Sequence, residues 1–170
     1  MVGTGDKRPR YSTFQRSCHW SIAALCVLEF PTAAGIHRGH LGRVFGIQAT
    51  AWDYSLAAAH EGGGWLILTL SAALAVSRLG RSAPSLPSDM PVWQRLSAYA
   101  VHTAMYGGLV ALVASGVVAM HADGRVGFLH TTLAKIGVAL IAIHVAAALW
   151  HQIVRRDGLL AGMLPWRKTH

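Results

Sequence analysis

The chain has 170 residues, of which 53% are hydrophobic and 13% are charged, and its formal net charge is +8. This composition argues against an ordinary soluble domain, and the length favours one domain covering residues 1–170. No basic run is interleaved with aromatic residues, so the positive charge indicates a membrane surface and not a nucleic-acid partner.

Four apolar segments follow one another along the chain, and each is close to the roughly 20 residues that span a bilayer as a helix. They cover about residues 18–36, 58–79, 97–120 and 131–154. Glu29 and Pro31 interrupt the first segment, and Pro31 is expected to end or kink its helix. Because a helix satisfies its own backbone in lipid, the pattern predicts an all-α, integral membrane four-helix bundle.

The distribution of Lys and Arg predicts the orientation. Basic residues are concentrated in the two tails and the middle loop, at Lys7, Arg8, Arg10, Arg16, Arg78, Arg81, Arg95, Arg155, Arg156, Arg167 and Lys168. The two opposite loops contain only Arg38, Arg43 and Arg125, with Lys135 at a helix start. By the positive-inside rule, both termini are expected to be cytoplasmic. The linker over residues 37–55 is expected to lie partly in the membrane interface through Trp52 and Tyr54.

Ten histidines in so apolar a chain need an explanation, and four of them occur at matching depths. With this orientation, His19 lies near the cytoplasmic start of the first helix and His60 near the periplasmic start of the second. His130 and His144 are fourteen residues apart on the fourth helix. That spacing gives a rise of about 21 Å and a return to within about 40° of the same face. The depths predict that His19 pairs with His144 and His60 with His130.

Each pair is suited to hold one planar iron porphyrin between helices, with neutral imidazoles as axial ligands. Two haem b groups are therefore expected. Covalent c-type attachment is not supported, since the chain contains no C-x-x-C-H motif. Glycines follow His60 and occur along the third helix, where they let helices pack closely or make room for a macrocycle.

The remaining histidines are interpreted differently. His102 and His151 are expected to be outer groups or propionate contacts and not ligands. Four others are interpreted as surface or tail residues: His37, His40, His121 and His170. An acid inside a spanning segment is costly, so Glu29 has two open interpretations, proton handling or exposure at the periplasmic interface.

At this point the chain resembles the bacterial cytochrome b561 family over residues 10–165. The resemblance is carried by "RYSTFQRSCHW", "AHEGGGWLILTLSAALAVSRL", "MPVWQRLSAYAVHTAMYGGLVALVASG" and "LHTTLAKIGVALIAIHVAAALWHQIVRRDGLLAGMLP". It implies a four-helix, two-haem protein of the bacterial inner membrane that exchanges electrons with the quinone pool. It also implies that the haem ligands are His19, His60, His130 and His144. The loop between the third and fourth helices is shorter here than in many members.

The leading functional hypothesis is electron transfer between the ubiquinone pool and a periplasmic redox partner. A quinone site is expected at a membrane interface, and Arg78, Arg81 and Trp93 are candidates by location. An alternative suggested by the family is a superoxide:ubiquinone oxidoreductase. The basic residues that would steer superoxide are Arg38, Arg43, Arg125 and Lys135, with His37, His40 and His121 nearby.

Two further hypotheses belong to other classes. The chain is also compatible with a haem-binding anchor subunit of a hydrogenase or dehydrogenase, although such subunits are usually longer. A haem-free metal transporter is disfavoured, because the paired histidines have no carboxylates or cysteines beside them in the pattern.

Overall fold

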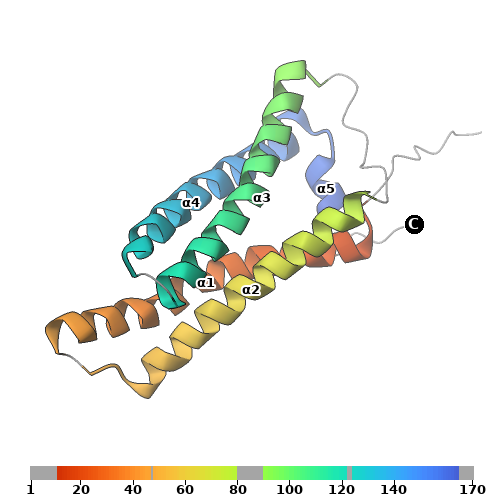
Figure 1. Cartoon of the computed structure of the whole chain (residues 1–170). Coiled ribbons are helices and arrows are strands. Elements are labelled where there is room, and N and C mark those ends of the chain that lie inside the picture. Colours follow the sequence, from red (N-terminus) through yellow and green to blue (C-terminus); the bar gives the residue numbers. More distant parts are fainter. Residues whose placement is uncertain (1–10, 47, 80–89, 122–123, 165–170) are drawn as a thin grey trace, which may run out of the picture.

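The computed structural model describes residues 11–46, 48–79, 90–121 and 124–164 (Figure 1). Its long helices are α1 (Thr13–Phe45), α2 (Ala51–Leu79), α3 (Val92–His121) and α4 (Gly127–Trp150). Short helical turns over Gly124–Val126 and His151–Arg155 flank α4, and α5 (Leu159–Met163) follows. Within the described ranges there is no β-strand, which confirms the predicted all-α class.

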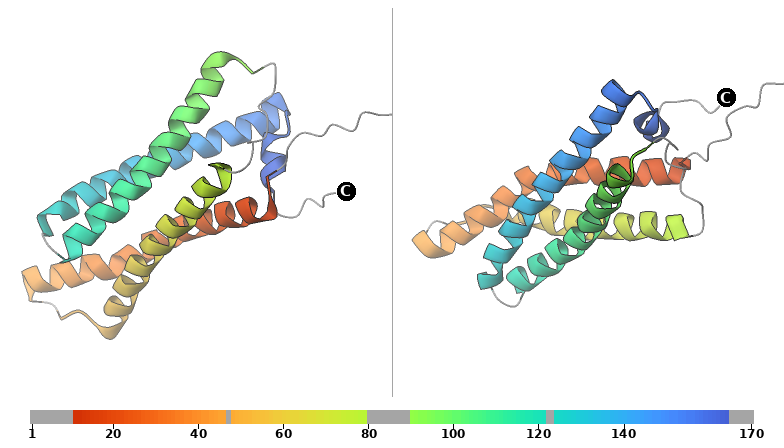
Figure 2. Two further views of the ribbon diagram at one scale, coloured as in Figure 1. Left: turned by 45° about the vertical axis from the view of Figure 1, so that its right-hand side comes forward. Right: turned by 90° about the horizontal axis from the view of Figure 1, so that it is seen from above.

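The four long helices form two antiparallel hairpins. α1 packs along α2 and α3 packs along α4, while α2 also contacts α3 (Figure 2). We call the end that holds the starts of α1 and α3 the terminal end, and the opposite end the loop end. At the terminal end, the Arg155 guanidinium donates to Gln94 Oε1 at 3.3 Å, and the Trp20 indole donates to the Met163 carbonyl at 2.8 Å. These bonds join the helical turn after α4 to α3, and α5 to α1.

The first three predicted spanning segments lie inside α1, α2 and α3, which are longer. The fourth, about 131–154, begins inside α4 and continues into the helical turn His151–Arg155. α1 begins at a capping box, in which Ser12 Oγ accepts from the Gln15 amide and Gln15 Oε1 accepts from the Ser12 amide. The helix continues through Pro31 and ends at Gly46, whose φ of 72° is left-handed. The expectation that Pro31 might end this helix is therefore wrong. A proline inside a helix removes one backbone hydrogen bond, which membrane helices tolerate. The hydroxyl of the neighbouring Thr32 donates to the Leu28 and Glu29 carbonyls.

The linker between the first two helices also differs from the prediction. α1 extends to Phe45 and α2 begins at Ala51, so most of residues 37–55 is helical. Trp52 and Tyr54 lie in the first turn of α2 and are exposed. The sequence between Pro31 and Gly46 contains no further proline, so nothing local stops α1 earlier.

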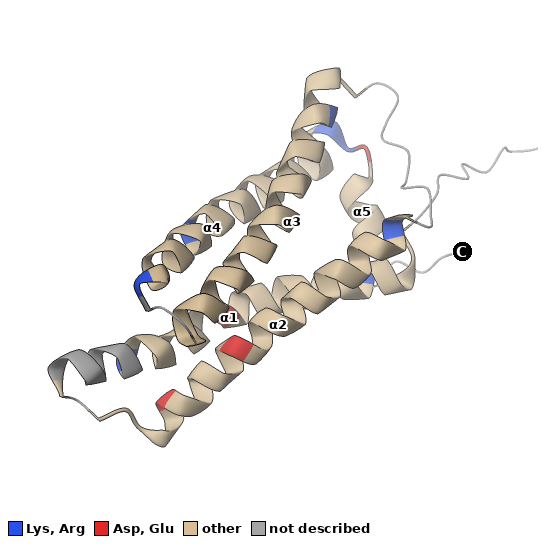
Figure 3. Ribbon diagram, viewed as in Figure 1, with Lys and Arg blue, Asp and Glu red and all other residues tan. Residues whose placement is uncertain are grey.

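The surface of the bundle is apolar, and half of the buried side chains among the described residues are polar. All four long helices are long and apolar enough to cross a membrane. Side chains such as Val27 and Phe30 are 68% and 62% exposed, whereas Asp53 and Ser115 are 5% and 6% exposed. Most Lys and Arg lie near helix ends (Figure 3). This arrangement inverts that of a water-soluble bundle, as expected where lipid is the solvent.

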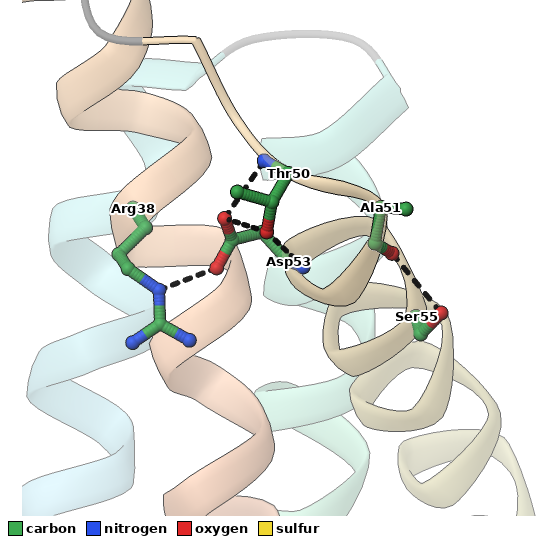
Figure 4. A network of polar contacts seen from close by, with 5 residues as sticks. All are labelled: Arg38, Thr50, Ala51, Asp53 and Ser55. Atoms are coloured by element: carbon green, nitrogen blue, oxygen red, sulfur yellow. Dashed lines mark hydrogen bonds and ion pairs between the residues drawn. The ribbon is translucent and has the colours of Figure 1, made fainter.

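A polar network fixes the start of α2 against α1 at the loop end (Figure 4). The Arg38 guanidinium forms an ion pair with Asp53. The other carboxylate oxygen of Asp53 accepts from the amide of Thr50 at 2.9 Å and from its hydroxyl at 2.7 Å. Ser55 donates to the Ala51 carbonyl within the same turn. The Asp53 carboxylate thus partly neutralises the positive charge of Arg38, which weakens any attraction of Arg38 for anions.

α1 and α2 approach each other most closely at Gly35. A Cβ placed there would overlap the Asp53 carbonyl oxygen, the Leu56 side chain and the Ala57 nitrogen. Two of these three contacts are with backbone atoms, which cannot swing aside. Glycine is therefore required here by helix–helix packing, in the way that small residues generally allow close contact in membranes.

We predict that Gly35→Ala destabilises the bundle by about 1–3 kcal/mol, the usual cost of overpacking. The matched control is Gly137→Ala on α4, where an added Cβ meets nothing within 4 Å. The control should be neutral or slightly stabilising, because alanine favours a helix. The melting temperature of each purified variant in detergent measures the difference. Equal melting temperatures for the two variants would contradict the close packing described.

Candidate functional site

The bundle brings four histidines together as two pairs at different depths. The ring centres of His19 and His144 are 6.2 Å apart, between α1 and α4. The ring centres of His60 and His130 are 6.1 Å apart, between α2 and α4. The first pair lies toward the terminal end and the second toward the loop end. These are the pairings that the depth argument predicted.

The distances suit a metal between the rings of each pair. Two imidazoles that bind one metal from opposite sides, through bonds of about 2 Å, have ring centres roughly 6 Å apart. Both pairs meet this condition. His102 on α3 lies nearer to His144, at 5.1 Å between ring centres, which is too close for an interposed metal. The geometry therefore favours His19 over His102 as the partner of His144.

At the loop-end pair, the hydrogen bonds of His130 fix which ring nitrogen is available. Its Nδ1 lies 2.9 Å from the Leu112 carbonyl oxygen and 3.3 Å from the Ser115 hydroxyl, both on α3. A carbonyl only accepts, so Nδ1 carries the proton and Nε2 keeps its lone pair. Gly116 faces the same ring, and a Cβ there would come within 3.0 Å of its Cε1 atom. Helix α3 thus both orients and makes room for this imidazole.

His60 is oriented by helix α1 in a related way. Its Nδ1 lies 2.6 Å from Glu29 Oε2, 3.2 Å from the Glu29 carbonyl oxygen and 3.3 Å from Thr32 Oγ1. Both Glu29 atoms are acceptors, so this Nδ1 also carries the proton and leaves Nε2 available. The Glu29 carboxylate fits because residue 63 is glycine, since a Cβ there would overlap Oε1. The Glu29 side chain therefore lies against a histidine, between α1 and α2, and is 21% exposed.

The terminal-end pair has different neighbours. The His19 ring packs edge-on against Trp20, and His102 lies beside His144 with its Nδ1 donating to the Ala98 carbonyl at 2.6 Å. Arg78 lies in the last turn of α2, near both paired rings. Its Nε is buried and has no hydrogen-bond partner among the described residues. A carboxylate such as a haem propionate would satisfy that donor, so the residues around this pair fit the group.

His151 belongs to a separate polar cluster in the π-helical turn after α4. Its Nδ1 lies 2.5 Å from Asp157 Oδ2, and Arg155 Nε lies 3.6 Å from the same oxygen. Asp157 also accepts from the Leu159 amide at 3.2 Å, which connects the turn to α5. The structure pairs His151 with Asp157 and does not bring it to either histidine pair, so its role as an outer group stays a prediction.

Other residues singled out in the sequence are dispersed. His121 bonds Glu61 at 3.0 Å, and His37 and Trp93 are exposed. Arg81, His170 and the side chains of His40 and Arg43 lie outside the described residues. The expectation that the paired histidines have no carboxylate beside them is wrong, because Glu29 contacts His60. Among the described residues, no group of three or more His, Cys, Asp or Glu side chains could hold a metal ion.

Sequence reasoning gave no role to Ser115, to the Leu112 carbonyl or to Asp157. Ser115 precedes Gly116 in an apolar helix, and a polar–small pair facing the bundle was the signal available. The Leu112 carbonyl could not be found from the sequence, because every residue has a backbone carbonyl. Asp157 lies in the "RRDG" stretch, which was used only for the family resemblance.

The fold has four helices that could cross a membrane, and they bring four histidines together as two pairs of imidazole rings. Comparison with known families gives a match to the model described as prokaryotic cytochrome b561, over residues 10–166. The chain therefore belongs to the prokaryotic cytochrome b561 family, which implies haem b binding and electron transfer in a membrane.

A curated relative supports this assignment. The chain is 32% identical to a protein named cytochrome b561 homolog 1 from Escherichia coli (strain K12). The alignment covers 51% of this chain and 62% of the relative, which is less than two thirds of the relative's length.

Proposed function

We propose that the chain binds two haem b groups, one held by His19 and His144 and the other by His60 and His130. The observation that carries this proposal is the spacing of the two ring pairs, 6.2 Å and 6.1 Å between centres. When bound, haem iron supplies one-electron reduction and oxidation. The chain's own residues orient the imidazoles and exclude water with apolar helices, and each histidine pair would supply two imidazole nitrogens to hold a haem.

The two pairs are at different depths because His130 and His144 are fourteen residues apart on α4, about 21 Å along the helix axis. One pair thus lies nearer each membrane face. With both termini cytoplasmic by the positive-inside rule, the His60–His130 pair is on the periplasmic side of the bacterial inner membrane. The proposed function is electron transfer between the ubiquinone pool and a periplasmic redox partner.

Two histidines per iron also constrain the chemistry. An iron with six ligands has no open position for oxygen, so the site favours transfer of electrons over activation of oxygen. The quinone is expected at the terminal end, where Arg78 lies beside the His19–His144 pair. That location remains a prediction from position and charge.

The ligand assignment predicts a specific pattern of haem loss. His19→Ala and His60→Ala should each reduce the bound haem from two per chain to one, because each removes an axial ligand of a different pair. His102→Ala is the matched control, since its ring is too close to His144 to be an opposite ligand. The pyridine haemochrome assay on purified protein measures haem per chain. Loss of one haem in His102→Ala, with two retained in His19→Ala, would reverse the assignment at the terminal-end pair.

A second candidate function is superoxide:ubiquinone oxidoreductase. The reaction balances as two superoxide anions, one ubiquinone and two protons giving two dioxygen molecules and one ubiquinol. The observation in its favour is that Arg125, in the turn before α4, and Lys135, about two turns into α4, are both exposed. Against it, Arg38 and His121 are paired with Asp53 and Glu61, which reduces the positive field of the proposed cluster.

If superoxide is attracted by these charges, the rate of superoxide-driven ubiquinone reduction falls several-fold between low and high ionic strength. The Debye length shrinks from about 10 Å at 0.1 M salt to about 3 Å at 1 M, which screens exposed charges. Lys135→Gln should lower the low-salt rate and leave the high-salt rate unchanged. A neutral reductant is the control for salt effects on the quinone step. A rate that does not depend on salt would reject electrostatic steering.

The anchor-subunit hypothesis makes a different prediction. It requires a large hydrogenase or dehydrogenase partner to co-purify with the chain under mild detergent. A chain that reduces quinone alone would reject it.

A further inference from the structure

The four proposed ligands differ in what their second ring nitrogen contacts. His60 Nδ1 lies 2.6 Å from the carboxylate of Glu29, whereas His130 Nδ1 faces a carbonyl and a hydroxyl. Neither His19 nor His144 has a hydrogen-bonded ring nitrogen within the described ranges. Thus only the loop-end pair has an anionic acceptor on a ligand, as far as the described residues extend.

A carboxylate that accepts from Nδ1 makes the imidazole a stronger electron donor to a metal on Nε2. The hydrogen bond is charge-assisted and draws the shared proton away from the ring. A more basic ligand stabilises the ferric iron relative to the ferrous iron. The reduction potential of the haem at that pair is therefore lowered.

The environment of the contact strengthens this effect. The side chains of His60 and Glu29 are 17% and 21% exposed, and both lie within spanning helices, where water screens charge poorly. The Glu29 carboxylate fits against α2 because Gly63 has no side chain there. The pair is thus held by α1 and α2 together.

We propose that Glu29 is a positioning residue that lowers the reduction potential of the haem held by His60 and His130 below that of the haem held by His19 and His144. Electron flow from the loop end to the terminal end is then downhill within the protein. This inference rests on the proposed function and extends it to the direction of transfer. It also replaces the two earlier interpretations of Glu29 with a role defined by its contact.

The test is a spectroelectrochemical titration of the purified, haem-loaded full chain. Glu29→Gln keeps the size of the side chain and removes its charge. It should raise the lower of the two midpoint potentials and leave the upper one in place. The electron-sharing equilibrium between the two haems should change on the order of tenfold, which corresponds to about 59 mV for a one-electron couple.

Glu61→Gln is the matched control for charge. Glu61 is on the same helix as His60 and next to it in the sequence, but its carboxylate contacts His121 at 3.0 Å. Removing this charge should leave both potentials near their original values. Equal shifts in Glu29→Gln and Glu61→Gln would overturn the proposal, because a general charge effect would then explain both.

A second pair of variants tests the contact without changing any charge. Gly63→Ala places a Cβ against Glu29 Oε1 and should displace the carboxylate from His60, which raises the lower potential. Gly62→Ala adds a Cβ that meets nothing within 4 Å and should have no effect. This pair keeps the proposal testable where Glu29→Gln loses haem.

The outcomes separate this inference from the proposed function. Fewer than two haems in the unmodified chain would contradict the proposed function itself. Two haems, with potentials that neither Glu29→Gln nor Gly63→Ala changes, would leave the proposed function standing and overturn the role of Glu29. The electron paramagnetic resonance g-values of the ferric protein give a second readout, because they respond to the basicity of an axial imidazole.

Discussion

A histidine ring inside an apolar bundle has two nitrogens that cannot hydrogen-bond to water. Each nitrogen therefore needs a partner within the protein, and this requirement determines how the helices pack around the histidines. In His60 and His130 one nitrogen is satisfied by a neighbouring helix, through Glu29 and the Leu112 carbonyl respectively. Each of these bonds fixes a tautomer and leaves Nε2 of the ring with its lone pair. The facing rings then stand 6.1 Å apart, as one metal between them requires. Orientation of the ligands is therefore a product of helix packing.

Small residues make that packing possible. Gly116 leaves room for the His130 ring, Gly63 for the Glu29 carboxylate and Gly35 for the closest approach of α1 to α2. None of them has a left-handed backbone, so their value lies in the missing side chain and not in conformational freedom. In a membrane, where apolar burial does not drive helices together, such close contacts supply much of the association. Larger residues at Gly116 or Gly63 would therefore both weaken helix packing and displace the groups that contact His130 and His60.

Much of this architecture is accessible from the sequence. Hydropathy predicts the four helices, and the fourteen-residue spacing of His130 and His144 predicts both pairs, because helix geometry converts position into depth. The course of α1 beyond Pro31 was not predictable, since its continuation depends on tertiary support for the freed backbone. The contact of Glu29 with His60 depends on how two helices are rotated against each other. A weak amphipathic pattern does not encode that rotation, which is why the role of Glu29 stayed open until the packing was known.

The central claim is that two haem groups are each held by two histidines. A dithionite-reduced minus air-oxidised visible spectrum of the purified protein, with haem quantified per chain, tests it most directly. The account predicts sharp low-spin b-type bands and two haems per chain. A single haem would mean that one pair is wrongly assigned, and the absence of haem would contradict the account as a whole.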